Sequence, residues 1–291
     1  MMKKVIGIGL ALAMVLGLAA CGGGAEDGGT EPSLISIVSR EEGSGTRGAF
    51  IELTGIEEKD ASGNKVDRTS DMAEISNSTS VVLATVIGNE RAIGYVSLGS
   101  MSDDVKALAI DGAEATVENI KSGVYSIARP FHLATKGEVN PATADFLAFV
   151  LSAEGQAVVE ASGYISATDG APYQASGAAG KVLVAGSSSV TPVMEKVKEA
   201  YVALNPSADI QIQQSDSTTG MTSAIEGICD IGMASRNLKD SELEAGLEPL
   251  VMAIDGIAVI VNPENPVNGM TLEQVRSVFI GETTDWNEIG E

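Results

Sequence analysis

The chain has 291 residues, of which 44% are hydrophobic, 20% charged and only 4% aromatic, a composition typical of globular and not of disordered proteins. Its 18 basic and 40 acidic residues give a net charge of −22. A surface this acidic disfavours nucleic acid and anionic lipid headgroups as partners, and an anionic ligand would have to be held by short-range hydrogen bonds.

Residues 1–20 have the features of a secretory signal. Two lysines precede the apolar run "VIGIGLALAMVLGLAA", which is short for a membrane span and ends in small residues. The sequence "LAAC" at 18–21 resembles the lipobox of bacterial lipoproteins, which implies cleavage before Cys21 and lipidation of its thiol. An ordinary signal peptide with a chance cysteine and an uncleaved anchor are the alternatives. Residues 21–33 are polar and Gly-rich, and are expected to form a flexible tether.

Between residues 35 and 163, strands and helices are expected to alternate. Extended segments are predicted at 35–39, 92–100, 105–112 and 125–137, the last of them broken by Pro130. Helices are predicted at 45–55, 79–89, 116–123 and 140–163. The polar segment 57–71 is predicted to be a loop.

The Gly/Ala-rich segment "ATDGAPYQASGAAGK" at 167–181 reads as a linker or a long surface loop. After it, strands are predicted at 181–186, 209–214, 230–235 and 247–267, and helices at 191–204, 220–228 and 271–281. Thr191 is expected to cap the first of these helices, with Pro192 as its first residue. Strands that alternate with helices predict an α/β fold with mostly parallel sheets.

Three strand-to-helix junctions are rich in hydroxyl groups: "EEGSGTRGAF" at 41–50, "AGSSSVTP" at 185–192 and "QSDSTTGMTS" at 214–223. Each places hydroxyls and free backbone N–H groups at a helix N-terminus, where an anion is favoured. One such junction is usually only a helix cap. Three in one chain, with Arg40 just before the first, favour a site for one tetrahedral oxyanion in a cleft between two lobes.

Several segments together resemble the phosphate-binding subunit of bacterial phosphate ABC importers: "SREEGSGTRGAF", "VLVAGSSSVTPVMEKVKEAY", "IGMASRNLKDSE", "AIDGIAVIVNPENPV" and "VRSVFIGETTDWNEIG". The resemblance implies a two-lobed, type II periplasmic-binding-protein-like α/β fold whose lobes are joined by two crossing strands. The phosphate ligands that it implies by position are Arg40, Ser44, Gly45, Thr46, Ser188, Ser189 and Ser217.

Arg236 departs from the family pattern, because some members carry an Asp there that accepts the proton of hydrogen phosphate. Asp255 is the nearest spare carboxylate in a family-like motif, so Arg236 and Asp255 are candidate specificity residues. The resemblance further implies a non-catalytic, monomeric phosphate carrier without a cofactor or metal. It would sit on the outer face of the cell membrane through its lipid anchor alone and deliver phosphate to the permease subunits of an ABC importer.

The order of the segments suggests a circular permutation. Family members begin with "VLVAGSSS" and reach "SREEGSGTR" only after "WNEIG", whereas here "SREEGSGTR" comes first. Residues 167–180 would then join the ancestral termini. Lobe one is expected at 126–266 and lobe two at 34–125 plus 267–291, with 125–131 and 259–266 as the crossing strands. A fragment or a misassembled gene is the rival explanation.

Two other functions remain open from the sequence. Gly43–Gly48 spells the dinucleotide-binding pattern G-x-G-x-x-G, and Asp67 lies at the required distance, but no apolar strand precedes Asp67. A phosphate or oxyanion sensor, or an adhesin, could use the same scaffold without transport. Neighbouring genes for a permease and an ATPase would favour transport.

Overall fold

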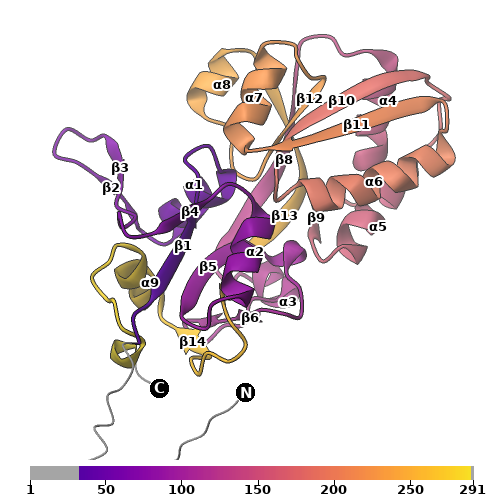
Figure 1. Cartoon of the computed structure of the whole chain (residues 1–291). Coiled ribbons are helices and arrows are strands. Elements are labelled where there is room, and N and C mark those ends of the chain that lie inside the picture. Colours follow the sequence, from indigo (N-terminus) through magenta and orange to yellow (C-terminus); the bar gives the residue numbers. More distant parts are fainter. Residues whose placement is uncertain (1–32, 290–291) are drawn as a thin grey trace, which may run out of the picture. The chain divides into compact units, whose positions relative to one another are not determined.

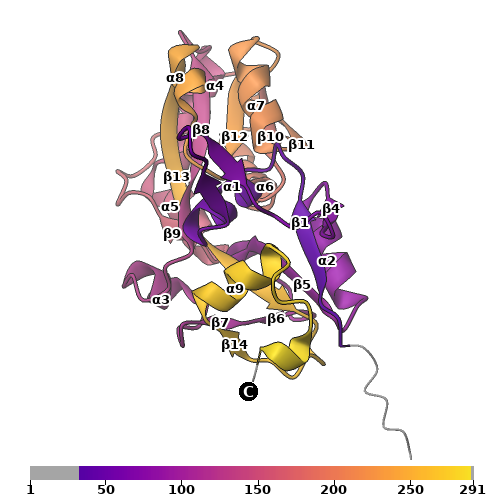
Figure 2. The same ribbon diagram turned by 90° about the vertical axis from the view of Figure 1, so that its left-hand side faces the viewer.

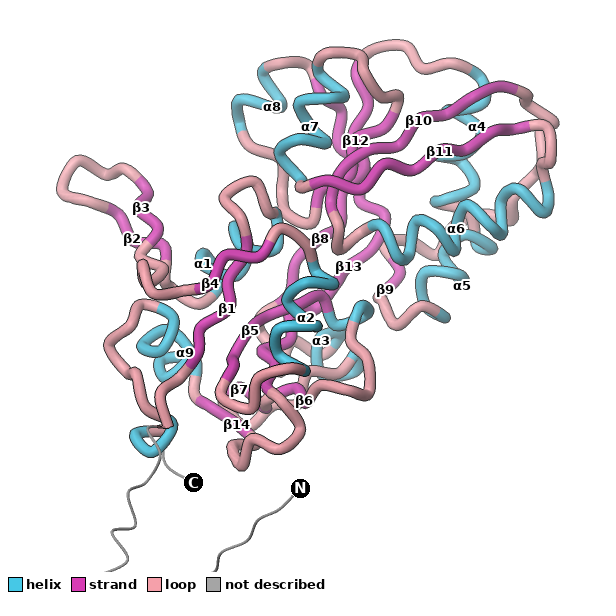
Figure 3. Tube along the Cα trace, viewed as in Figure 1, coloured by secondary structure: helices cyan, strands magenta, loops and turns pink. Residues whose placement is uncertain are grey.

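The computed structural model describes residues 33–289, so the predicted signal peptide, Cys21 and nearly all of the tether lie outside the described residues. Strands and helices alternate along the chain, as the sequence predicts (Figure 1, Figure 3). The strands are β1 (Ser36–Arg40), β2 (Glu57–Lys59), β3 (Lys65–Asp67), β4 (Glu74–Ser76), β5 (Ala92–Ser97), β6 (Lys106–Ala107), β7 (Ala109–Ile110), β8 (Ala128–Lys136), β9 (Ile165–Ser166), β10 (Gly180–Ser187), β11 (Ala208–Ser215), β12 (Ile231–Ala234), β13 (Leu247–Val261) and β14 (Gly269–Met270). The helices are α1 (Gly45–Leu53), α2 (Thr79–Ile87), α3 (Val117–Lys121), α4 (Pro141–Val150), α5 (Ala153–Ala161), α6 (Thr191–Leu204), α7 (Ser217–Ile225), α8 (Asp240–Glu244) and α9 (Leu272–Phe279), with 3₁₀ turns η1 (Leu98–Ser100) and η2 (Trp286–Glu288).

Most strands join one continuous sheet, in the order β11-β10-β12-β8-β13-β5-β1-β4, with β6 and β9 also paired to β13. At one end β10 pairs in parallel with β11 and β12, and at the other β1 pairs in parallel with β4 and β5. Between these groups, β8 and β13 run antiparallel to their neighbours. Two parallel α/β units are therefore joined through two antiparallel strands.

Strand β13 belongs to both units. Its residues Leu247–Gly256 pair with β8, and Ile257–Val261 pair with β5. The strand thus changes partner between Gly256 and Ile257, before the segment 259–266 that the sequence predicts as a crossing strand. The sequence of the apolar run 247–261 does not show where the strand changes partner, because its pairing register with β8 and β5 decides that position. The lobe boundaries themselves stay a prediction.

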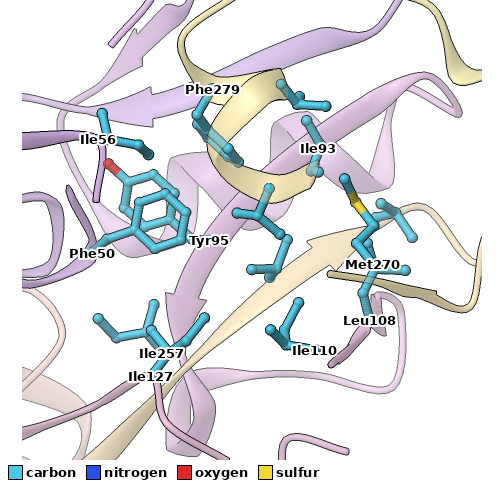
Figure 4. Close-up of a cluster of buried hydrophobic side chains, with 14 of the residues drawn as sticks. Phe50, Ile56, Ile93, Tyr95, Leu108, Ile110, Ile127, Ile257, Met270 and Phe279 are labelled. Carbon is cyan, nitrogen blue, oxygen red and sulfur yellow. The ribbon is translucent and has the colours of Figure 1, made fainter. Parts of the chain in front are cut away.

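Each unit has its own hydrophobic core. One core draws on residues 37–127 and 257–289, and we call this half lobe two; the other draws on residues 131–253, and we call it lobe one. Figure 4 shows the core of lobe two, where Phe50 of α1, Tyr95 of β5 and Phe279 of α9 meet, with the first two rings stacked at 3.9 Å. Figure 2 shows α9 beside the sheet of lobe two and α7 beside that of lobe one. This arrangement confirms the predicted two-lobed α/β class.

The predicted loop at 57–71 contains a hairpin instead. Strands β2 and β3 pair antiparallel, and Glu57 forms an ion pair with Lys65 across them at 2.7 Å. Asp60 closes the turn by accepting the backbone N–H groups of Ser62 and Asn64. The hairpin extends away from the main sheet (Figure 1). The diagonal Glu57–Lys65 ion pair supports it, and its sequence lacks the apolar alternation by which strands are predicted.

Two further local predictions are wrong. Pro130 does not break its segment, because β8 runs from Ala128 to Lys136 and Pro130 lies opposite Ile254 of β13. Thr191 does not cap α6 but begins it, and its hydroxyl donates back to the carbonyl of Ser187 at 3.0 Å.

The stretch predicted as one helix at 140–163 forms two helices, α4 and α5, bent by 59°. Ser152 lies at the break and caps α5 by accepting the N–H of Gly155 at 3.1 Å. Within residues 33–289 no single helix is long and apolar enough to cross a membrane, and this bent pair reaches that length and composition only when its two helices are taken together. Both helices contribute buried side chains, Phe146 and Val159 among them, to the core of lobe one.

The segment 167–179 forms no helix or strand, but it is attached to lobe one. The hydroxyl of Tyr173 donates to Asp145 of α4 at 2.6 Å, and its backbone N–H donates to Glu154 of α5 at 2.6 Å. The ring of Tyr173 packs edge-on against Phe149 at 5.1 Å and lies 6.2 Å from Tyr201. The segment is thus a strap fixed to the surface of lobe one.

The two ends of the described chain lie together in lobe two. The N–H of Ile35 donates to the carbonyl of Thr284 at 2.8 Å, and that of Trp286 donates to the carbonyl of Ser33 at 3.0 Å. Ile35 and Ile289 both pack against the core of lobe two. This proximity is compatible with the expected circular permutation, which stays a prediction.

If the strap holds α4 and α5 in place, Tyr173→Ala should lower the free energy of unfolding by about 2 kcal/mol. The change removes a packed ring and a hydroxyl bonded to a carboxylate. The neighbouring exposed Gln174 is the matched control, and Gln174→Ala should stay within about 0.5 kcal/mol of the parent. Denaturant unfolding measures both, and equal values for the two variants would contradict the prediction.

Candidate functional site

Arg40 ends strand β1 and is almost wholly buried, with 2% of its surface exposed. Its guanidinium forms a two-pronged ion pair with Glu41, at 2.8 and 2.7 Å. The same group donates to Ser188 of lobe one at 3.0 Å and to Thr79 at 3.4 Å. A buried charge needs such partners, and here they come from both lobes.

The junction from β1 to α1 follows the sequence prediction. Ser44 caps α1 by accepting the N–H of Arg47 at 3.3 Å, and Gly45 and Thr46 form the first turn. Thr46 reaches across to lobe one, where its hydroxyl lies 2.8 Å from that of Ser189. The N-terminus of α1 therefore faces the loop between β10 and α6.

The hydroxyl of Ser217, the first residue of α7, accepts the backbone N–H of Ser235 at 3.1 Å. The hydroxyl of Ser235 lies 2.9 Å from that of Ser187 and 3.4 Å from that of Thr46. Seven buried hydroxyls are thus linked into one hydroxyl cluster: Thr46, Thr79, Ser187, Ser188, Ser189, Ser217 and Ser235.

Thr79, Ser187 and Ser235 are the members of the cluster that the sequence prediction does not name, although Ser187 lies in the predicted junction at 185–192. Thr79 begins α2, and its hydroxyl lies 3.3 Å from that of Ser188 and 3.1 Å from that of Ser189. The segment "SNSTS" before α2 has the same hydroxyl-rich character as the three predicted junctions, and this signal could have identified Thr79. Ser235 directly follows β12, in the "MAS" motif. Three helix starts are predicted at the site, and the structure has four.

Comparisons with known proteins agree with this architecture. A family model described as a PBP superfamily domain matches residues 26–154 and 171–291. The chain is 54% identical over 284 residues to "Phosphate-binding protein PstS 2" of Streptococcus agalactiae serotype V, with 97% of both chains covered. It is 42% identical over 275 residues to the protein of the same name from Streptococcus pneumoniae serotype 4, with 94% of both covered. The chain belongs to the PstS family of phosphate-binding proteins.

A solved structure gives the same result for the fold of this PstS-family chain. The crystal structure of a phosphate-binding protein of a phosphate ABC transporter from S. pneumoniae TIGR4 matches with a TM-score of 0.70 and 42% identity, covering 88% of this chain and 99% of that one. The match over 97% of the S. agalactiae relative also requires the same order of segments in both chains. The order of segments in this chain is therefore shared with that relative.

In this PstS-family chain, the guanidinium of Arg236 is bonded to residues outside the hydroxyl cluster. It forms a two-pronged pair with Glu242 of α8, at 2.8 and 2.7 Å, and donates to the carbonyl of Asn237 and to Thr218. Its aliphatic part lies beside the start of α1, where a Cβ on Gly45 would be 3.1 Å from the Cγ of Arg236. A direct bond from Arg236 to an anion would require this ion pair to open.

Asp255 is buried at the crossing of the strands. Its two oxygens accept hydrogen bonds from Ser97 at 2.9 Å and from Arg129 at 3.0 Å. Burial raises the pKa of Asp255 to about 6, against the opposing effect of Arg129. Both oxygens of Asp255, a candidate acceptor for the proton of hydrogen phosphate, therefore already have donors within the protein.

Gly43, the first glycine of the G-x-G-x-x-G pattern, lies at a contact between the lobes. The carbonyl of Gly43 accepts the N–H of Thr218 at 3.1 Å, and a Cβ on Gly43 would lie 2.3 Å from a carboxylate oxygen of Asp216. Asp67, the candidate ribose ligand, lies on the β2–β3 hairpin and pairs with Arg47 at 2.8 Å. The geometry of these residues gives the dinucleotide hypothesis no support.

Gly45 and Gly48, both in α1, should respond to alanine in opposite ways. A Cβ on Gly45 would lie 2.4 Å from the hydroxyl of Ser217, whereas the nearest atom to a Cβ on Gly48 is 3.9 Å away. Gly45→Ala should lower the free energy of unfolding by about 1–3 kcal/mol through overpacking. Gly48→Ala should raise it by roughly 0.4–1 kcal/mol, since alanine favours the helix. Thermal unfolding measures both, and stabilisation by Gly45→Ala would show that the loops do not meet.

Proposed function

We propose that this chain binds inorganic phosphate outside the cytoplasm and delivers it to the permease subunits of an ABC importer. The observation that carries the proposal is the convergence of Arg40 with hydroxyls from four helix starts, contributed by both lobes. The names of its relatives support phosphate as the ligand and an ABC transporter as the system that it serves. On this proposal the chain is a carrier and not an enzyme.

The proposed phosphate shell has one fixed charge and many hydroxyls. Arg40 would supply the charge, and the residues expected from the sequence, Thr46, Ser188, Ser189 and Ser217, would supply hydroxyl or backbone donors. Ser44 and Gly45 would present the N-terminus of α1. We add Thr79 and Ser235, because both are bonded to the residues already assigned.

Hydroxyls suit a ligand that carries a proton. A serine or threonine hydroxyl can donate to one phosphate oxygen or accept from a protonated one. Hydrogen phosphate could therefore be recognised without a free carboxylate, which matters because Asp255 is engaged with Arg129 and Ser97. Sulfate has no proton to offer, so the hydroxyls could only donate to it.

The first test of the function is calorimetric titration of the pure chain with phosphate, arsenate, phosphite and sulfate. Phosphate and arsenate should bind more tightly than sulfate. Ser188→Ala should weaken phosphate binding by about one to two decades, since a bond to a charged ligand is worth roughly 1.5–3 kcal/mol. Arg40→Ala should cost more, because it removes the fixed charge and leaves Glu41 unpaired.

Ser223→Ala is the matched control for these variants. Ser223 lies on α7, like Ser217, but its hydroxyl donates back to the carbonyl of Thr219 at 2.8 Å. Its removal should leave the affinity for phosphate within about twofold of the parent. If none of the four anions binds more tightly than about millimolar, the proposed function fails.

Lipid anchoring is part of the proposal and rests on the sequence "LAAC" alone, because Cys21 lies outside the described residues. The membrane fraction of the producing cell should contain the chain with Cys21 at its N-terminus and a diacylglyceryl-sized mass increment. Cys21→Ala should release the chain from the membrane. An unmodified Cys21 in membrane-bound protein would contradict the anchoring.

A further inference from the structure

A second buried arginine lies where the strands cross. Arg129 of β8 is opposite Asp255 of β13 in the register, and the two form an ion pair of 3.0 Å. The other oxygen of Asp255 accepts from Ser97, at the end of β5. Arg129 is 3% exposed and Asp255 1% exposed, so the pair is removed from solvent.

Arg129 uses only part of its hydrogen-bonding capacity. Within residues 33–289, four buried side-chain polar atoms lack a hydrogen-bond partner, and two of them are Nε and Nη1 of Arg129. The ring of Phe131 lies 5.4 Å from the guanidinium carbon, which favours the charge but satisfies neither N–H group in its plane. A buried donor without a partner costs about 1–3 kcal/mol, so these groups need an acceptor that the protein does not supply.

One more of the four atoms belongs to the strand beside the one that carries Arg40. The hydroxyl of Ser76 is buried and without a partner, and Ser76 is opposite Arg40 in the register of β4 and β1. The order β8-β13-β5-β1-β4 places Arg129, Asp255, Ser97, Arg40 and Ser76 on five successive strands. Three of the four unsatisfied atoms therefore belong to strands of the row that also carries Arg40.

Arg129 lies beside residues of both lobes. It lines a cavity of about 580 Å³, whose other walls include Gly48 and Glu52 of α1 and residues 236–240. Burial lowers the pKa of Arg129, and the nearby charge of Arg40 lowers it further. Two guanidinium groups thus lie near one another, each balanced by one carboxylate, Glu41 or Asp255.

We propose that Arg129 is a second arginine of the anion site, donating to the bound oxyanion through N–H groups that have no protein partner. Asp255 would hold the Nη2 group and so orient the guanidinium. This rests on the proposed binding of phosphate and adds a residue to that site. Each arginine is already balanced by one carboxylate, so Arg129 would add directed N–H donors to the site and no net charge. The ligand class is the tetrahedral oxyanion of the proposed function.

The purely structural alternative makes a different prediction. A buried ion pair contributes little net stability against a well-packed neutral replacement, whereas removing one partner leaves a buried charge uncompensated. The test variant is therefore the double exchange Arg129→Gln/Asp255→Asn, which removes both charges and keeps amides that can hydrogen-bond. Arg129→Lys is the second variant, because it keeps the ion pair with Asp255 but loses the extra N–H groups.

The measurement is phosphate affinity by calorimetry, with thermal unfolding of each variant alongside. Arg129→Gln/Asp255→Asn and Arg129→Lys should each weaken phosphate binding at least tenfold. The control is Arg276→Gln/Glu58→Gln, which removes an ion pair in lobe two between α9 and the β2–β3 hairpin. The control should bind phosphate within about twofold of the parent.

The outcomes separate this inference from the proposed function. If the parent binds phosphate and a folded Arg129 variant binds it equally well, Arg129 is structural and the inference alone is overturned. If the double variant fails to fold, Arg129→Lys decides the question, because it retains the pair with Asp255. If the parent binds no tetrahedral oxyanion, the proposed function fails and the inference fails with it.

Discussion

The burial of Arg40 is the constraint on which the arrangement of the two lobes depends. A guanidinium out of contact with water must have its charge balanced and its donors satisfied, and Glu41 alone does not do both. Ser188 supplies an acceptor from the opposite lobe at 3.0 Å. The backbone is held as well, with the N–H of Arg40 donating to the hydroxyl of Tyr95 and its carbonyl accepting from Arg47. The side chain is therefore set in place before any ligand is considered.

The sheet explains why so many hydroxyls meet at this point. In a parallel α/β unit, the carboxyl ends of the strands and the N-termini of the following helices lie on the same edge. Each lobe has one such edge, and β13 joins the two units as a single unbroken strand. The helix starts of α1 and α2 therefore face those of α6 and α7. A tether between separate domains would not impose this opposition.

Features that depend on neighbouring residues could be predicted from the sequence, and features that depend on register could not. Ser44, Thr46 and Ser188 follow from the local strand-to-helix pattern, and the structure brings Thr46 and Ser188 into one cluster with Arg40. The partner of Asp255 could not be predicted, because only the register of β8 with β13 places Arg129 opposite it. The β2–β3 hairpin was missed for a related reason: its pairing uses charges, which resemble an ordinary polar loop in the sequence.

The proposed binding of an anion has to be reconciled with the net charge of the chain, which is −22. The buried arginines do not create a positive region, because Arg40, Arg129 and Arg236 are paired with Glu41, Asp255 and Glu242. Each pair is neutral as a unit. The attraction must then come from directed donors and from the positive ends of helix dipoles, which act over a few ångströms and are little affected by distant charge. Net charge therefore bears on how fast an anion arrives, whereas the geometry of the donors decides how firmly it is held.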